Sequence, residues 1–235
     1  MLPKLDIRPN RTMRDYLSSQ IDAFLLEYPT FSIVQKDAEK IVLGGEYDLN
    51  GEYQGLVLSE IFQIKIEVPI DFPANLPEVY ETKTINNFSH KYANGKLCLM
   101  VDLELYIWLQ NAPSLTRFFA EIVVPYLYSY KFYSITGEMP FGERSHGSEG
   151  VSEAMKEIFN VNDVLAAGRL LYYVVHNNKY RGHHLCPCGS GKNIRNCHAK
   201  ILKEFFDHKG ENAFSSLLNL SLQEILRHVE SKNKR

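Results

Sequence analysis

Apolar residues follow two different spacings along the first part of the chain. Over residues 12–28 they recur every three or four positions, which is typical of an amphipathic helix. Over residues 61–68 they alternate with polar residues, which predicts a strand with one buried face. Shorter apolar segments at residues 31–34 and 41–47 predict two further strands. The chain is therefore expected to begin with a helix and to continue into a sheet.

Three prolines then interrupt the alternation. Pro69, Pro73 and Pro77 fix φ and lack a backbone N–H group, so the chain must leave the sheet before a short strand at residues 78–82. Residues 85–109 have no regular period and are predicted to be irregular, with a turn at Asn94-Gly95.

Helical spacing dominates the second half of the chain. Ser114 is predicted to cap an amphipathic helix that runs through Leu127, with a kink at Pro125. Glycine and proline mark residues 134–150 as a long loop. Further helices are predicted at residues 151–159, 164–176 and 201–206, and a last one is expected to start at a cap formed by Ser221 and Glu224.

The composition is that of a soluble globular protein, with 45% apolar residues, 23% charged residues and a formal net charge of −2. The 235 residues suffice for one domain of ordinary size and a smaller appendage. No apolar run is long enough to span a bilayer, and the first eleven residues lack the hydrophobic core of a secretion signal. We therefore expect a cytoplasmic protein without membrane association, whose reduced thiols serve metal binding or catalysis.

Three thiols and one imidazole lie within thirteen residues near the C-terminus: Cys186, Cys188, Cys197 and His198. Four such ligands complete a tetrahedral zinc site and leave no position for water, so the expected zinc ion is structural. Two preceding histidines, His183 and His184, could compete as ligands but are expected to be surface residues. The run Cys-Pro-Cys-Gly-Ser-Gly-Lys, the eight-residue gap and the final Cys-His closely resemble the SEC-C motif, named for its place at the C-terminus of a protein-export motor ATPase.

Basic residues crowd the same segment: Lys179, Arg181, Lys192, Arg195, Lys200 and Lys203. The expected role of the nearest of these cations is to offset the negative charge of three thiolates on a divalent ion. Binding of nucleic acid by this tail is not expected, because no aromatic platform is interleaved with the cations. A role in recruiting a protein partner is expected instead.

The fourth cysteine, Cys98, stands alone after the Asn-Gly turn. Its apolar neighbours are compatible with an inert buried thiol. A chain that doubles back at the turn would instead bring His90, eight residues upstream, beside Cys98 and create a candidate nucleophile. Local features alone leave both interpretations open.

The order of elements resembles the ubiquitin-conjugating enzyme fold. The resemblance rests on Phe-Pro at positions 72–73, Pro-Glu-Val at 77–79, Gly-Lys-Leu-Cys-Leu at 95–99 and Trp108, in this order. It implies an α+β fold with an N-terminal helix, a four-stranded antiparallel meander and C-terminal helices, followed by a small zinc-binding helical tail. The implied domains are a conjugating-like domain at residues 1–160, a helix and linker at 161–182 and the zinc tail at 183–235.

The resemblance also implies a reaction. Cys98 would accept a ubiquitin-like modifier, or the C-terminus of a nucleotidyltransferase, as a thioester from an activating enzyme and pass it to an amine of a target protein. His90 occupies the place of the family's asparagine and would donate to the oxyanion. His146, with Glu138 and Glu143 in the same loop, would guide the amine. Bacterial relatives of this kind belong to antiphage defence systems.

Two other functions remain open from the sequence. The chain could be an inactive adaptor of the conjugating fold, with Cys98 buried. It could also be a cysteine hydrolase that cleaves thioester or isopeptide conjugates through Cys98 and His90.

Overall fold

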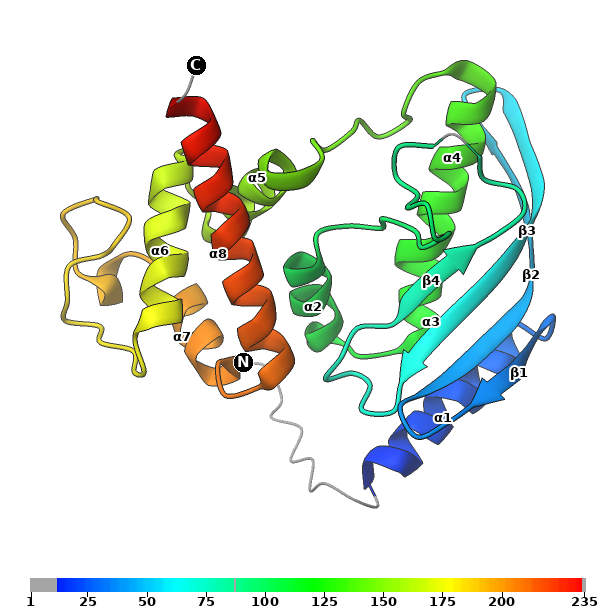
Figure 1. Ribbon diagram of the computed structural model, residues 1–235, viewed down its shortest axis with the longest axis horizontal. Helices are drawn as coiled ribbons and strands as arrows, with labels where there is room; N and C mark the ends of the chain where they lie inside the picture. The colour runs from blue at the N-terminus through cyan, green and yellow to red at the C-terminus, as the bar shows by residue number, and fades with distance from the viewer. Residues whose placement is uncertain (1–11, 87, 234–235) are drawn as a thin grey trace. The chain divides into compact units, whose positions relative to one another are not determined.

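The computed structural model describes residues 12–86 and 88–233, which form two compact units (Figure 1). The first unit runs to Met100 and resumes at Leu105–Glu143. The second contains Val101–Glu104 and the chain from Arg144 onward. Residues 1–11, to which the expectation about a secretion signal refers, lie outside the described residues.

The first unit carries the whole sheet of the described chain, whose strand order is β1-β2-β3-β4 with every neighbouring pair antiparallel. The prediction of an α+β fold with an N-terminal helix and a four-stranded antiparallel meander is thereby confirmed. The elements of this unit are α1 (Thr12–Glu27), β1 (Phe31–Lys36), β2 (Lys40–Tyr53), β3 (Leu56–Pro69), β4 (Glu78–Glu81), α3 (Leu115–Phe118), the π-helical turn η1 (Phe119–Val123) and α4 (Val124–Thr136).

The hairpin between β2 and β3 is longer than the sequence predicts. Its last pair is Tyr53 opposite Leu56, and the two turn residues Gln54 and Gly55 both have positive φ, as a tight two-residue hairpin turn requires. The outer half of the hairpin has one half-buried face, which includes the buried Leu49 and Leu58. The sequence does not show this alternation clearly, because Glu60 lies on the inner face while Val57 and Ile61 are exposed on the other.

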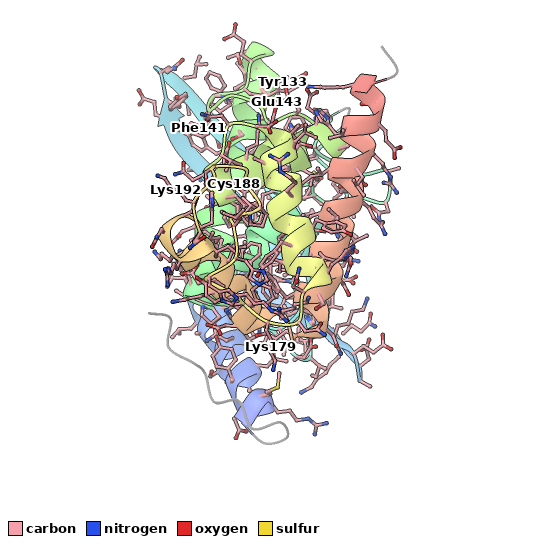
Figure 2. The ribbon with its side chains drawn as sticks, turned by 90° about the vertical axis from the view of Figure 1, so that its left-hand side faces the viewer. Tyr133, Phe141, Glu143, Lys179, Cys188 and Lys192 are labelled. Carbon is pink, nitrogen blue, oxygen red and sulfur yellow. The ribbon has the colours of Figure 1, made fainter. Side chains whose placement is uncertain are left out.

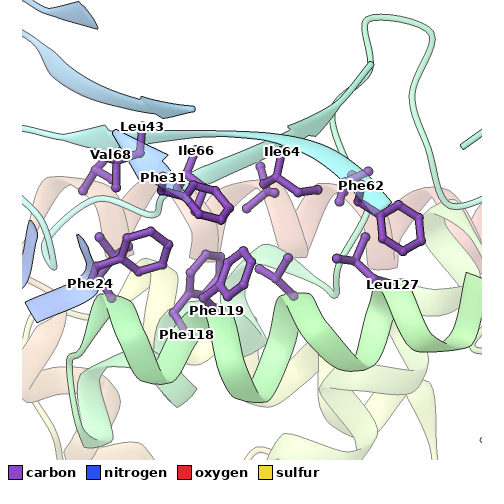
Figure 3. Packing of buried hydrophobic residues seen from close by; sticks show 14 of the residues in the cluster. Phe24, Phe31, Leu43, Phe62, Ile64, Ile66, Val68, Phe118, Phe119 and Leu127 are labelled. Atoms are coloured by element: carbon purple, nitrogen blue, oxygen red, sulfur yellow. The ribbon is translucent and has the colours of Figure 1, made fainter. Parts of the chain in front are cut away.

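Aromatic side chains fill the space between the sheet and the long helical run α3–η1–α4, as Figure 3 shows. Phe119 lies at the centre, with its ring centroid 5.4 Å from that of Phe24 on α1 and 5.5 Å from that of Phe31 on β1. Burial of one such side chain stabilises the fold by about 2–3 kcal/mol. At Gly45 a Cβ atom would lie 2.6 Å from the Phe31 ring, so the packing requires glycine there.

The long helix begins and bends as its sequence indicates. The Ser114 hydroxyl accepts a hydrogen bond from the backbone N–H of Arg117 at 3.2 Å, which is the predicted cap. The wider π-helical turn lies directly before Pro125. Pro125 lacks a backbone N–H to donate to the preceding turn of helix, and its ring crowds the carbonyl groups there. The wider π-helical geometry of residues 119–123 makes room for the ring.

Two predictions of secondary structure are wrong. Residues 85–109 are not irregular throughout, because α2 occupies Asp102–Asn111. The apolar residues of this helix are distributed over nearly all of its sides, so its sequence shows no amphipathic period. The last helix, α8, begins at Asn212 and not at the expected Ser221 cap. Ser221 is buried in the interior of α8, where the spacing to Glu224 mimics a capping box.

The second unit is helical. It contains α5 (Gly147–Phe159), α6 (Val164–His176), the 3-10 turn η2 (Ile194–Asn196), α7 (Ala199–His208) and α8 (Asn212–Asn233). α8 packs against both α5 and α6. Because α5 packs with these later helices, it belongs to the second unit, and the domain boundary after residue 160 stays a prediction. Lys209 caps α6: its Nζ donates to the carbonyl oxygens of Val174, Val175 and Asn177 at 2.5, 2.8 and 2.6 Å.

A buried carboxylate holds the loop that follows the sheet. Glu81, the last residue of β4, is fully buried and accepts hydrogen bonds from the backbone N–H groups of residues 83, 84 and 85 at 3.0, 2.7 and 2.9 Å. Lys91 Nζ lies 3.1 Å from the same carboxylate. Burial acts to raise the pKa of Glu81, but the three backbone donors and Lys91 outweigh it and hold that pKa below its ordinary value.

Replacement of this carboxylate tests its role. We expect Glu81→Gln to lower the free energy of unfolding of the first unit by about 3 kcal/mol at neutral pH, because it breaks a buried, hydrogen-bonded ion pair. The control Glu121→Gln removes the exposed helix pair with Arg117 and should cost about 0.5 kcal/mol or less. Urea unfolding is followed by the fluorescence of Trp108, the only tryptophan of the chain.

The difference between wild type and Glu81→Gln should depend on pH. Since the folded-state pKa of Glu81 lies below the ordinary value of 4.5, its stabilisation is complete above that pH and is lost as the pH falls through the lower folded-state pKa. A difference that stayed constant on acidification would show that the Glu81 charge does not hold the loop.

Candidate functional site

The segment that carries Cys98 runs back along β4. The predicted turn is present: the N–H of Gly95 donates to the carbonyl oxygen of Tyr92 at 2.9 Å, and Gly95 has a φ of +87°. Beyond the turn, the N–H of Leu97 donates to Val79 on β4 at 2.8 Å. These bonds add a short extended segment to the edge of the sheet and place Cys98 at its end.

The backbones of His90 and Cys98 lie opposite each other in this hairpin, because the chain doubles back at the turn. The N–H of Cys98 donates to the carbonyl oxygen of His90 at 2.7 Å. The hydroxyl of Tyr126 on α4 donates to the same oxygen at 2.9 Å. Burial, with a smaller effect of the nearby Cys98, raises the pKa of Tyr126, so this phenol stays a neutral donor. The backbone beside the thiol is therefore fixed from two sides.

The imidazole of His90 is paired with a carboxylate. Its Nε2 lies 3.0 Å from Oε1 of Glu143. Glu143 is labelled in Figure 2 and belongs to the loop after α4. An ionised carboxylate only accepts hydrogen bonds, so Nε2 must carry a proton in this contact. The ring also packs on Phe88, with centroids 5.3 Å apart. Both contacts fix the orientation of an imidazole whose side chain is only 15% exposed.

A tyrosine that the sequence analysis did not single out lies beside the thiol. The hydroxyl of Tyr92 is 3.7 Å from Sγ of Cys98, and Cys98 itself is partly exposed. The hairpin pairs Tyr92 with Lys96, which brings residues 92 and 98 to the same end of the turn. The only sequence signal for this contact is the position of Tyr92 just before Asn94-Gly95.

The other two predicted loop residues lie farther along the chain. Glu138 is exposed in the segment after α4. His146 directly precedes α5 in the second unit, with extended backbone angles of −87° and 160°. Their part in guiding an amine stays a prediction.

The four predicted metal ligands converge in the second unit. The ligand atoms of Cys186, Cys188, Cys197 and His198 all lie within 4.8 Å of one another. Sγ of Cys186 and Sγ of Cys197 are each 3.2 Å from Nδ1 of His198. Three thiols and one imidazole at this separation can hold a metal ion, and they are the donor types that zinc prefers. Neither His183 nor His184 belongs to this group.

Local backbone bonds build the ligand loop. The N–H of Cys186 donates to the carbonyl oxygen of Lys192 at 2.7 Å, and the loop between them turns through Gly189 and Gly191, both of positive φ. The turn η2 then places Cys197, and His198 directly precedes α7. The spacing of the ligands in the sequence thus follows from one tight hairpin and one helix start.

Two contacts tie this loop to the rest of the unit. Ile194 is fully buried beneath it. Arg169 on α6 donates from Nε to the carbonyl oxygen of Pro187 at 2.8 Å and from Nη2 to that of Cys188 at 3.2 Å. Burial raises the pKa of the Cys186 thiol to about 12, so a bound cation must displace its proton.

No protein-family model matches the chain, and no curated protein matches it at a significant level. Among the described helices, none is long and apolar enough to cross a membrane.

The metal site can be tested by titration. We expect the full chain to bind one Co(II) ion, with the thiolate-to-metal charge-transfer absorption of a tetrahedral site, and to exchange it for Zn(II). Loss of a residue that hydrogen-bonds to a metal ligand typically lowers metal affinity by about 10- to 100-fold. Cys186→Ser removes a ligand itself, so it should lower the affinity for Co(II) by more than this. Cys98→Ser is the matched control and should leave the spectrum unchanged. A spectrum altered equally by both variants would contradict the assignment of ligands.

Proposed function

We propose that the chain is a ubiquitin-conjugating-like enzyme that carries an acyl group as a thioester on Cys98. The observation that best supports this is the setting of the thiol. Cys98 is partly exposed, its backbone is fixed by His90, and the hydroxyl of Tyr92 lies 3.7 Å from its sulfur. The helix and the four-stranded antiparallel meander before it have the order of elements known in that family.

The proposed reaction has two acyl transfers. In the first, the Cys98 thiolate attacks the thioester carbonyl of a modifier held by an activating enzyme, a new C–S bond forms, and the thiolate of the activating enzyme leaves. In the second, a neutral amine of a target attacks the Cys98 thioester. A C–N bond forms, the bond to Cys98 breaks, and the amine proton passes to solvent.

Each neighbouring group has a proposed role. Tyr92 would donate to the Cys98 thiolate and keep it in place. His90 would act as an imidazolium: its Nε2–H is held by Glu143, and its Nδ1–H would donate to the oxyanion that forms in each transfer. His146 and Glu138 would guide the incoming amine.

The partners follow from the resemblance to the conjugating family. They are an activating enzyme, a ubiquitin-like modifier or the C-terminus of a nucleotidyltransferase, and a target protein, in a bacterial antiphage system. The metal site would hold zinc in a structural role, because three thiolates and one imidazole complete its tetrahedron.

The pairing of His90 with Glu143 favours a second candidate function, a cysteine hydrolase. An imidazole oriented by a carboxylate can also act as a general base toward a thiol or a water molecule. Such an enzyme would consume thioesters without an amine.

The proposal is tested with a synthetic peptide thioester that ends in Gly-Gly, followed by intact mass spectrometry. Wild type should gain one peptide adduct that thiols remove, Cys98→Ala none, and Cys98→Ser an adduct that resists thiols. Added lysine should discharge the adduct to a peptide amide. His90→Ala should slow adduct formation by about 10²–10³-fold, the usual cost of one oxyanion donor.

Other results would contradict the proposal. Rapid turnover of excess thioester to free acid, without an accumulating adduct, would identify a hydrolase. If wild type formed no adduct although iodoacetamide still alkylated Cys98, the chain would be an inactive adaptor of the same fold.

A further inference from the structure

The chain around the metal ligands is strongly basic. Residues 164–203 contain seven lysine and arginine residues and no aspartate or glutamate. All seven are exposed, and the six that follow Arg169 form what we call the basic surface: Lys179, Arg181, Lys192, Arg195, Lys200 and Lys203. Three thiolates on a divalent ion would cancel only one unit of this positive charge.

Among the residues that the structure describes, the cations of the basic surface have no anionic partner. Within residues 12–86 and 88–233, none of the six forms an ion pair. Other arginines of the second unit do: Arg144 binds Glu157 at 2.7 Å, and Arg227 binds Glu224. The contrast indicates that this surface is built for a negative charge from another molecule.

Backbone contacts gather these cations around the metal loop. The N–H of Arg195 donates to the carbonyl oxygen of Gly182 at 2.9 Å, which brings Arg195 next to Arg181. Lys203 on α7 lies over the ring of Tyr180, 5.5 Å from its centroid. The N–H of Cys186 donates to the carbonyl oxygen of Lys192 at 2.7 Å, so Lys192 lies on the metal loop, where Figure 2 labels it together with Cys188. Cations from three separate segments therefore share one region.

An aromatic pair lies on the adjoining stripe of α6. Arg169, which binds the metal loop at Pro187, is followed at helical spacing by Tyr172 and His176. The rings of Tyr172 and His176 are 3.9 Å apart, and Tyr172 is 54% exposed. The sequence does not indicate this arrangement, because the aromatic pair precedes the basic residues along the chain and joins them only through the Arg169 contact.

We propose that the basic surface and Tyr172 bind single-stranded nucleic acid. The cations would contact successive phosphates, and the exposed ring of Tyr172 would stack on a base, the combination typical of single-strand binding. A paired duplex would not offer a base face for stacking. An acidic peptide would use the cations but would gain little from the aromatic pair. This inference is independent of any reaction at Cys98.

The electrostatic part is tested with the full zinc-loaded chain and fluorescent oligouridylate and oligothymidylate, in anisotropy titrations over a range of salt concentrations. The triple variant Lys179→Gln, Lys192→Gln, Lys200→Gln should lower the slope of log K against log salt by about 2, since each phosphate contact contributes about 0.7. The control triple variant Arg14→Gln, Lys36→Gln, Lys83→Gln removes three exposed cations of the first unit and should leave the slope unchanged.

The stacking part is tested at Tyr172. Tyr172→Ala should weaken binding about tenfold or more, while Tyr172→Phe keeps an aromatic ring and should bind like wild type. Unchanged Co(II) spectra would show that each variant keeps its metal loop. A preference for RNA or for DNA would identify the source of the strand.

Three outcomes would overturn the proposal. One is that both triple variants change the slope equally, which would mean unspecific attraction to the whole protein. Another is that polyglutamate of equal charge competes as well as the oligonucleotides, which would identify an acidic protein as the partner. The third is that duplex DNA binds as tightly as single strands and is insensitive to Tyr172→Ala.

Discussion

The position of the candidate nucleophile depends on one buried carboxylate. Glu81 is the last residue of β4, and its carboxylate accepts hydrogen bonds from the backbone N–H groups of residues 83–85. These bonds fix the conformation of the loop where it leaves the sheet. Lys91 reaches the same carboxylate from the hairpin that carries His90 and Cys98. The carboxylate thus joins the start of the loop to its far end. Without it, the backbone of His90 would lose the anchor next to it, and the hairpin would be held only by its remaining contacts, such as the backbone bond from Leu97 to Val79.

The fold was predictable where burial is one-sided. The helix α1 and the inner part of β3 each bury one face, so the spacing of their apolar residues predicts them and their order. The outer hairpin at Tyr53 and the helix α2 were not predictable in this way. The hairpin has polar residues on its inner face and apolar ones on its exposed face, and α2 is apolar on nearly all sides. At Ser221 a local pattern was overruled by packing, since α8 passes through that position without a break.

The two candidate sites also differ in how far the local sequence predicts them. The metal ligands lie within thirteen residues, and their chemistry alone predicts that they meet. The surroundings of Cys98 come from β4, from α4 and from the loop after it. The contacts of His90 with Glu143 and with Tyr126 join residues that are 53 and 36 positions apart in the chain. No local pattern encodes such distances, so Glu143 was found only as a loop residue and Tyr92 was missed.

The hold of Arg169 on the metal loop has a consequence for how the protein can change over evolution. Its guanidinium binds carbonyl oxygens of positions 187 and 188, which every amino acid possesses. Drift of the side chain at position 187 therefore leaves the attachment intact, whereas Arg169 itself has no substitute, since lysine lacks the planar fork that reaches two oxygens at once. Homologues that retain the cysteines should vary at the proline more freely than at this arginine on α6.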